Sequence, residues 1–117
     1  MDMRRAKSSF WERLVGYDFF ISHARLDGAL LAESIHKTSK SVGLTPFLDT
    51  GEIIHSEKIS KRVKAGLKRS SILMVLLTKE AYRSKWVARE IQQFGQTRSI
   101  LPIIIDEPPS DSSPESL

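Results

Sequence analysis

The sequence predicts an α/β domain in which helices cover a parallel β-sheet. Three observations lead to this fold class. Strand-like and helix-like segments alternate along the chain, and such alternation is typical of parallel sheets. The strand-like segments are short, nearly continuous apolar runs, as expected of strands that are covered on both faces. The helix-like segments carry apolar stripes with a period of 3.6 residues. A length of 117 residues fits one such domain.

The first strand is predicted over residues 17–23, Tyr-Asp-Phe-Phe-Ile-Ser-His, where aromatic and β-branched residues are concentrated. A helix follows directly after Asp27, a residue type that caps helix N-termini. Leu31 and Ile35 share one face of this helix by their four-residue spacing, which makes that face the one expected to meet the core. Gly43 is a natural stop for the helix.

A second strand is predicted over residues 44–48, where Pro46 favours a position at the edge of the sheet or at the start of the strand. Residues 50–56 follow as a loop. The next helix, predicted over about 57–68, has one apolar stripe, and bases fill its other side. The stripe consists of Ile59, Val63, Gly66 and Leu67, and the bases of the segment are Lys58, Lys61, Arg62, Lys64, Lys68 and Arg69.

Residues 71–77, Ser-Ile-Leu-Met-Val-Leu-Leu, form a third strand, and residues 100–105 form a fourth. The helix between them is predicted over about 79–96, with Val87, Ile91 and Phe94 at core spacing. In open parallel sheets ligands bind beyond the carboxyl ends of the strands. Functional residues are therefore expected just after each strand.

The two ends of the chain differ in charge. Residues 1–16 form a basic extension with a short helix, and residues 106–117 form an acidic tail, rich in proline and serine, that is expected to be disordered. The formal net charge of +4 hides this asymmetry, because residues 1–105 carry 18 bases against 10 acids. A basic body suits a nucleic acid, an anionic membrane or a phosphorylated ligand, and its charge alone does not choose among them.

Several functional classes are excluded by what the chain lacks. Without cysteine it has no disulfide, no thiolate zinc site and no cysteine nucleophile. It contains no Gly-rich dinucleotide or P-loop motif, and three histidines make a histidine-rich metal cluster unexpected. Its longest apolar run, residues 100–105, is far shorter than the roughly 20 residues of a membrane span. With no signal peptide in view, the expected location is the cytoplasm.

Tyr82, Trp86 and Glu90 follow one another at four-residue steps, which places them on one stripe of the predicted third helix. A carboxylate beside an aromatic ring is partly desolvated. Desolvation raises its pKa and suits proton transfer or stabilisation of a developing cation. The spacing alone leaves a second interpretation open, in which Glu90 is a solvated residue or the partner of a nearby base.

The ordered set of motifs resembles the Toll/interleukin receptor (TIR) domain, most closely its bacterial members, over residues 17–105. The motifs are Tyr17-Asp-Phe-Phe-Ile-Ser-His23, Phe47-Leu-Asp49, the helix with Val63, Leu67 and Ser70, the run Ile72 to Leu77, Tyr82-Arg-Ser-Lys-Trp86-Val-Ala-Arg-Glu90 and Leu101-Pro102-Ile. The resemblance implies a flavodoxin-like three-layer αβα sandwich with about four parallel strands in the order 2-1-3-4. Members of this family add a fifth strand and a last helix, so the chain is expected to be truncated or a minimal variant.

The resemblance also implies chemistry. Many TIR domains cleave NAD+ at the nicotinamide–ribose bond, and the glutamate that they require lies four residues after a tryptophan. The matching residues here are Glu90, as the catalytic residue, and Trp86, on which the pyridinium ring would stack. NAD+ is then the substrate, and no cofactor or metal is expected.

Five further residues are candidates for the site: three by their position just after the first strand, and two by their match to positions in and before the long loop of this family. Ser22, His23 and Arg25 are expected to meet the ribose or the phosphates, although an ordinary hydrogen-bonding role is equally open for His23. Asp49 opens the long loop after the second strand, and Ile53 occupies an apolar position in that loop. Where most members have a glycine in the loop, this chain has Ser56, which restricts the backbone.

Other TIR domains are the expected protein partners. The alternative to catalysis is a signalling or adaptor module that works through homotypic TIR–TIR contacts. Direct binding of nucleic acid or membrane by the basic body is a third possibility. No aromatic residues interleave with the bases of residues 58–69, so a groove for single-stranded nucleic acid is poorly supported.

Overall fold

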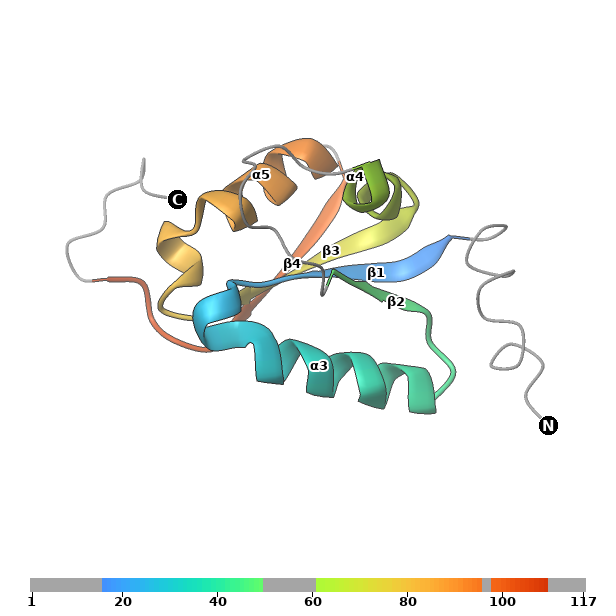
Figure 1. The fold of residues 1–117 in the computed structure, drawn as a ribbon, viewed down its shortest axis with the longest axis horizontal. Coiled ribbons are helices and arrows are strands. Elements are labelled where there is room, and N and C mark those ends of the chain that lie inside the picture. The colour runs from blue at the N-terminus through green and yellow to red at the C-terminus, as the bar shows by residue number, and fades with distance from the viewer. Residues whose placement is uncertain (1–15, 50–60, 96–97, 110–117) are drawn as a thin grey trace.

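The computed structural model describes residues 16–49, 61–95 and 98–109. They form four strands, three α-helices and one short 3₁₀ helix (Figure 1). Along the chain these are β1 (Tyr17–Ser22), α3 (Arg25–Ser41), β2 (Pro46–Leu48), α4 (Lys61–Lys68), β3 (Ser70–Leu77), η1 (Ala81–Arg83), α5 (Lys85–Phe94) and β4 (Ser99–Ile104). The predictions for residues 1–15, for the loop 50–56 and for residues 110–117 lie outside the described residues.

The sheet is parallel throughout and has the strand order β2-β1-β3-β4, as predicted. Phe20, in the middle of β1, lies opposite Phe47 of β2 on one side and Leu73 of β3 on the other. α3 covers one face of the sheet, and α4 and α5 cover the other (Figure 1). The flavodoxin-like three-layer arrangement is therefore confirmed, and β2 is an edge strand, as Pro46 indicated.

Each face of the sheet has its own apolar core. Val63 and Leu67 of α4 pack with Val87 and Phe94 of α5 on one face. The other core is smaller, and α3 contributes to it chiefly through Ala32. No described helix has the length and apolar character that crossing a membrane requires.

The start of α3 differs from the prediction. Ala24, not Asp27, is the N-cap residue, and no side chain caps this end. The Asp27 carboxylate instead accepts hydrogen bonds from Thr78 Oγ1 at 2.6 Å and from the backbone N–H of Glu80 at 3.0 Å. Asp27 thus ties α3 to the segment after β3. The hydroxyl of Thr78 and the N–H of Glu80 take the place of the backbone N–H groups that an N-cap side chain would bind.

The buried side of α3 is also shifted from the one expected. Gly28 and Ala32 face the core and Ile35 is partly buried, while Leu31 is 36% exposed. Gly43 has a φ of +91° and donates its N–H to the carbonyl of Lys40, so it ends the helix as predicted.

The helix predicted over 79–96 is divided in two at Ser84. Ser84 has an extended backbone, with φ −79° and ψ 120°, and its Oγ accepts a hydrogen bond from Val87 N–H at 3.1 Å as the N-cap of α5. Tyr82 lies on η1 and donates its hydroxyl hydrogen to the Asp106 carbonyl, so it does not share a stripe with Trp86 and Glu90.

The first residue of the predicted tail is anchored. The backbone N–H of Asp106 donates to the Leu77 carbonyl, and its carboxylate accepts from Lys79 N–H at 2.8 Å. These bonds hold the chain against the end of β3 beyond the last residue of β4.

Candidate functional site

The parallel sheet brings three of the residues predicted for the site to one edge. Ser22 is the last residue of β1, His23 follows it, and Asp49 follows β2, so these residues lie at the carboxyl ends of neighbouring strands. α5 crosses the same region and places Glu90 on its buried side, together with Val87 and Phe94. Residues that are distant in sequence therefore meet at the edge where ligands bind in such sheets.

Glu90 lies at the centre of this group. Its side chain is only 2% exposed, and its Oε1 accepts a hydrogen bond of 2.6 Å from Ser22 Oγ. The side chain of Trp86, one helical turn earlier, lies close enough to Glu90 to lower the pKa of this carboxyl. Because Ser22 is itself fully buried, this carboxyl group is enclosed, and it meets a substrate only after the side chains over it move.

Burial raises the pKa of Glu90 to about 8, because the charged form is deprived of water. The hydrogen bond from Ser22 lowers the pKa of Glu90 because it stabilises the carboxylate, and the side chain of Trp86 lowers this pKa as well. The negative charge of Asp49 raises the pKa and the positive charge of Arg25 lowers it. At neutral pH the Glu90 carboxyl in this closed arrangement is therefore mainly protonated.

Asp49 and His23 complete the group. Asp49 is 7% exposed, and its Oδ1 lies 3.3 Å from Nη1 of Arg62 on α4 in an ion pair. His23 is also buried, and burial lowers its pKa, so it is neutral at pH 7. Arg25, the first residue of α3, is exposed, and its charge contributes to lowering the pKa of both His23 and Glu90.

The sequence matches the family model described as "TIR domain" over residues 19–117. This chain belongs to the TIR domain family. The match covers most of the chain and includes every element from β1 onward.

Two proteins from different organisms are similar in sequence to this TIR domain over most of its length. The probable 2′ cyclic ADP-D-ribose synthase TcpB of Brucella abortus (strain 2308) is 31% identical over 107 residues, which cover 86% of this chain and 42% of that protein. The probable 2′ cyclic ADP-D-ribose synthase TcpO of Methanobrevibacter olleyae is 27% identical over 94 residues, covering 77% of this chain and 28% of that protein. The chain thus spans less than half the length of these relatives.

Solved structures support the fold. The TIR domains of the activated Roq1 resistosome, which recognises the pathogen effector XopQ, superpose with a TM-score of 0.68 at 21% identity, covering 80% of this chain and 60% of that one. The TIR domain of the Toll-related receptor TRR-2 from Hydra magnipapillata has a TM-score of 0.65 at 15% identity, covering 85% of this chain and 77% of that one.

Six of the seven residues predicted for the site of this TIR domain are described. A hydrogen bond joins Ser22 to Glu90, and Trp86, Asp49 and Arg25 lie near enough to shift its pKa. His23 lies near enough to Arg25 and Asp49 for their charges to act on it. Ile53 lies outside the described residues. Among residues 16–49, 61–95 and 98–109, no three His, Asp or Glu side chains are grouped so that they could hold a metal ion.

Arg62 was not singled out from the sequence. It is one of the bases on the predicted helix, and its pairing with Asp49 depends on how α4 sits beside β2, which the pattern does not reveal. The short separation of 13 residues between Asp49 and Arg62 is the only sign of this pair in the sequence.

Replacing Glu90 with glutamine is expected to change how stability depends on pH. Its pKa is about 8 in the folded state and 4.5 for an unperturbed glutamate, so folding takes up a proton between these pH values and stability falls as pH rises through this window. The loss approaches about 1.4 kcal/mol per pH unit. Glu90→Gln removes it, so urea unfolding between pH 5 and 9 should show a flatter profile for the variant. Glu107→Gln, at an exposed acid, is the control, and parallel wild-type and Glu90→Gln profiles would contradict the prediction.

Proposed function

We propose that this TIR domain cleaves NAD+ at the nicotinamide–ribose bond, with Glu90 as the catalytic residue. The observation that carries the proposal is the almost fully buried carboxyl of Glu90, which accepts a hydrogen bond from Ser22 beside Trp86 at the carboxyl edge of a parallel sheet. Relatives named probable 2′ cyclic ADP-D-ribose synthases support it, because ADP-ribose is the part of NAD+ that remains when nicotinamide leaves.

The chemistry requires a negative charge close to the ribose. As the bond from C1′ to the nicotinamide nitrogen breaks, both electrons leave with the nitrogen and nicotinamide departs as a neutral molecule. The positive charge moves to the ribose as an oxocarbenium ion. An anionic Glu90 stabilises this ion more strongly than it stabilises the substrate, which lowers the barrier. Water or a hydroxyl of the ADP-ribose moiety then bonds to C1′ and gives up a proton, and these two routes yield linear and cyclic products.

The neighbouring side chains have roles in this proposal. Trp86 stacks against the cationic pyridinium ring, and its side chain favours the charged form of Glu90. Ser22 fixes the same carboxylate from β1. The exposed guanidinium of Arg25 meets the phosphates, with His23 beside it as a neutral hydrogen-bonding group. Asp49, directly after β2, and Ile53 are kept in this proposal as further contacts of the substrate. We place this activity in the cytoplasm, in signalling or defence.

Assembly with other TIR domains is a second candidate function, favoured by one observation on α3. Leu26 and Leu30 are 81% and 83% exposed and lie four residues apart, so they form an apolar pair on the outer side of the helix. Such a pair suits contact with another TIR domain. Assembly is compatible with catalysis and is also sufficient for a signalling module without it.

Glu90→Gln is expected to lower the rate of NAD+ cleavage by at least about 100-fold, because it removes the charge that stabilises the oxocarbenium ion. Nicotinamide release by concentrated protein, with and without a crowding agent, measures this. Glu107→Gln serves as the matched exposed control and should retain wild-type turnover. Equal turnover in the wild type and Glu90→Gln would refute the role of Glu90, and absence of turnover in the wild type would favour the signalling module.

The pH profile of cleavage provides an independent test. Because catalysis requires the carboxylate, kcat/KM should rise with pH towards a midpoint near 8, the pKa of Glu90 in the free protein. Bound NAD+ brings a positive charge to the site and lowers this pKa, so the midpoint for kcat should be lower than the one for kcat/KM. Ser22→Ala removes a hydrogen bond to the carboxylate and should move the kcat/KM midpoint upward. A flat profile in the wild type from pH 6 to 9 would count against the proposal.

Removing the leucine pair should weaken association. The double variant Leu26→Ser and Leu30→Ser loses the apolar contact area, whereas Val42→Ser, 69% exposed in the wild type at the other end of α3, is the matched control. Sedimentation velocity over a range of concentrations should show larger species for the wild type and the control than for the double variant. Unchanged association in the double variant would exclude this face of α3 as the contact.

A further inference from the structure

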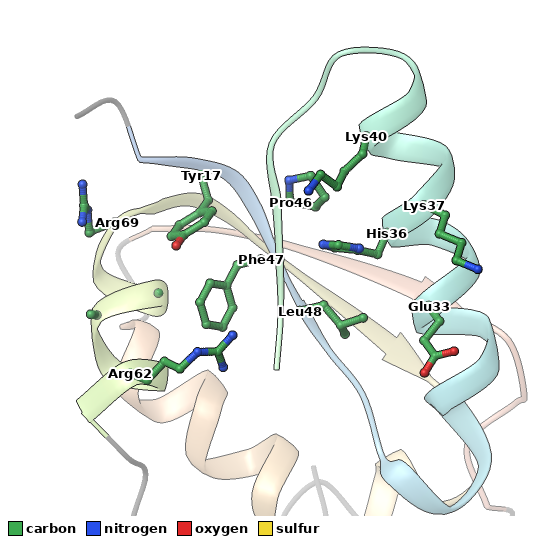
Figure 2. Close-up of a pocket in the computed structure, with 12 residues that line it drawn as sticks. Tyr17, Glu33, His36, Lys37, Lys40, Pro46, Phe47, Leu48, Arg62 and Arg69 are labelled. Carbon is green, nitrogen blue, oxygen red and sulfur yellow. The ribbon is translucent and has the colours of Figure 1, made fainter. Parts of the chain in front are cut away.

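A concave notch opens at the β2 edge of the sheet, away from Glu90. It has a volume of about 650 Å³ and lies between α3 and α4, with β2 as its floor (Figure 2). We call this feature the β2 notch. The described residues that line it are Tyr17, Glu33, His36, Lys37, Lys40, Pro46, Phe47, Leu48, Arg62, Ala65, Gly66 and Arg69.

The charges around the β2 notch are mostly positive. α3 contributes Lys37 and Lys40, α4 contributes Arg62, and Arg69 lies just after α4, while Glu33 is the one acid among the described lining residues. In Figure 2 the side chains of Lys40 and Arg62 reach towards β2 from opposite sides. A ligand that satisfies both groups must therefore carry at least two anionic positions.

The floor of the notch is apolar and firmly packed. Phe47 stacks on Phe20 with a centroid distance of 4.9 Å and meets the edge of Tyr17 at the same distance. α4 comes so close that a Cβ added at Gly66 would lie 2.7 Å from the Phe47 ring. The guanidinium of Arg62 lies 4.9 Å from the centre of that ring. Arg62 is thus presented by a rigid surface, which reduces the entropy lost when it binds an anion.

The edge of β2 is poorly suited to adding a peptide strand. β2 has only three residues, and the first of them, Pro46, has no N–H to donate. In the neighbouring position both backbone groups of Thr45 are directed at β1, since its carbonyl accepts from Asp18 N–H and its own N–H donates to the Asp18 carboxylate at 2.6 Å. Recognition in the notch therefore depends on the cationic side chains and not on main-chain pairing.

We propose that the β2 notch is a binding site for a small anion with two or more phosphate groups, held between Lys40 of α3 and Arg62 of α4. Phosphate is favoured because a guanidinium binds its oxygens through paired, charge-assisted hydrogen bonds, while an ammonium group binds them as a point charge. The apolar floor accommodates the uncharged part of an organic oligophosphate such as a nucleotide. Binding in the β2 notch does not depend on the NAD+ cleavage proposed for Glu90, and it is tested separately.

His36 provides a reporter inside the notch. Its imidazole points towards β2 in Figure 2. Burial lowers its pKa, and the charge of Lys40 acts in the same direction. The charged groups that line the notch with it are Glu33, Lys37 and Lys40 on its own helix, Arg62 on α4 and Arg69 just after α4. An oligophosphate bound among them adds negative charge, so it must raise the pKa of His36.

Inorganic pyrophosphate is the first probe, with orthophosphate as the single-phosphate comparison and ADP as an organic diphosphate. Calorimetric titration near physiological ionic strength should give tighter binding of pyrophosphate than of orthophosphate, and binding should weaken with added salt. ADP binding more tightly than pyrophosphate would assign the site to nucleotides, and equal binding would assign it to the diphosphate group alone. Either result supports the site.

Lys40→Gln should weaken pyrophosphate binding roughly ten-fold, because it removes a charge-assisted contact. Lys64→Gln is the matched control, since Lys64 is exposed on α4 and is absent from the lining residues described. Its affinity should stay within about two-fold of the wild type. Equal losses in the two variants would show that pyrophosphate responds to net charge only, and would overturn the proposal.

Titration of the histidine ring signals by NMR locates the bound anion. Saturating pyrophosphate should raise the pKa of His36 by about half a pH unit or more and leave the pKa of His23, at the end of β1, unchanged. A shift at His23 without one at His36 would place the anion at the Glu90 site. That result, or no measurable binding of pyrophosphate or ADP, would refute the β2 notch as an oligophosphate site.

Discussion

The hydrogen-bonding of β1 on both of its edges is the constraint on which the rest of this structure depends. β1 pairs in parallel with β2 and with β3, so the carboxyl ends of all three strands lie at one edge of the sheet. A side chain placed just after β1 is then within reach of the loop after β2 and of the helices that cross the sheet. Ser22 is the last residue of β1, at the edge of that region, and α5 brings Glu90 to within 2.6 Å of its Oγ. The candidate site is thus a consequence of parallel pairing.

Local patterns were sufficient to predict the order of strands and helices, because each strand is an apolar run that is recognisable by itself. They were not sufficient where a polar side chain chooses between local and distant partners. Asp27 has the chemistry of an N-cap, yet Thr78, 51 residues away, takes its carboxylate. Ser84 interrupts a helix whose periodicity continues across it, since its hydroxyl starts a new helix at Lys85. Both outcomes depend on tertiary contacts that periodicity does not encode.

The same limit applies to the site. The four-residue spacing from Trp86 to Glu90 indicated a ring beside a carboxyl and a raised pKa, and burial does raise it. The spacing did not indicate that Glu90 faces the core together with Val87, because its partner Ser22 is 68 residues away in sequence. A buried carboxyl opposes folding at neutral pH, and such a cost is typical of groups kept for function. The rest of the core compensates for it.

Arg62 connects the two surfaces that the fold creates at β2. Its guanidinium lies 3.3 Å from Asp49 and also lines the notch. The charge of Asp49 raises the pKa of Glu90, and Arg62 partly neutralises that charge. Binding in the notch and the chemistry at Glu90 are separate proposals, yet the two surfaces share this one guanidinium. The edge strand that closes the sheet therefore places Arg62 between a surface notch and the group of residues around the buried carboxyl.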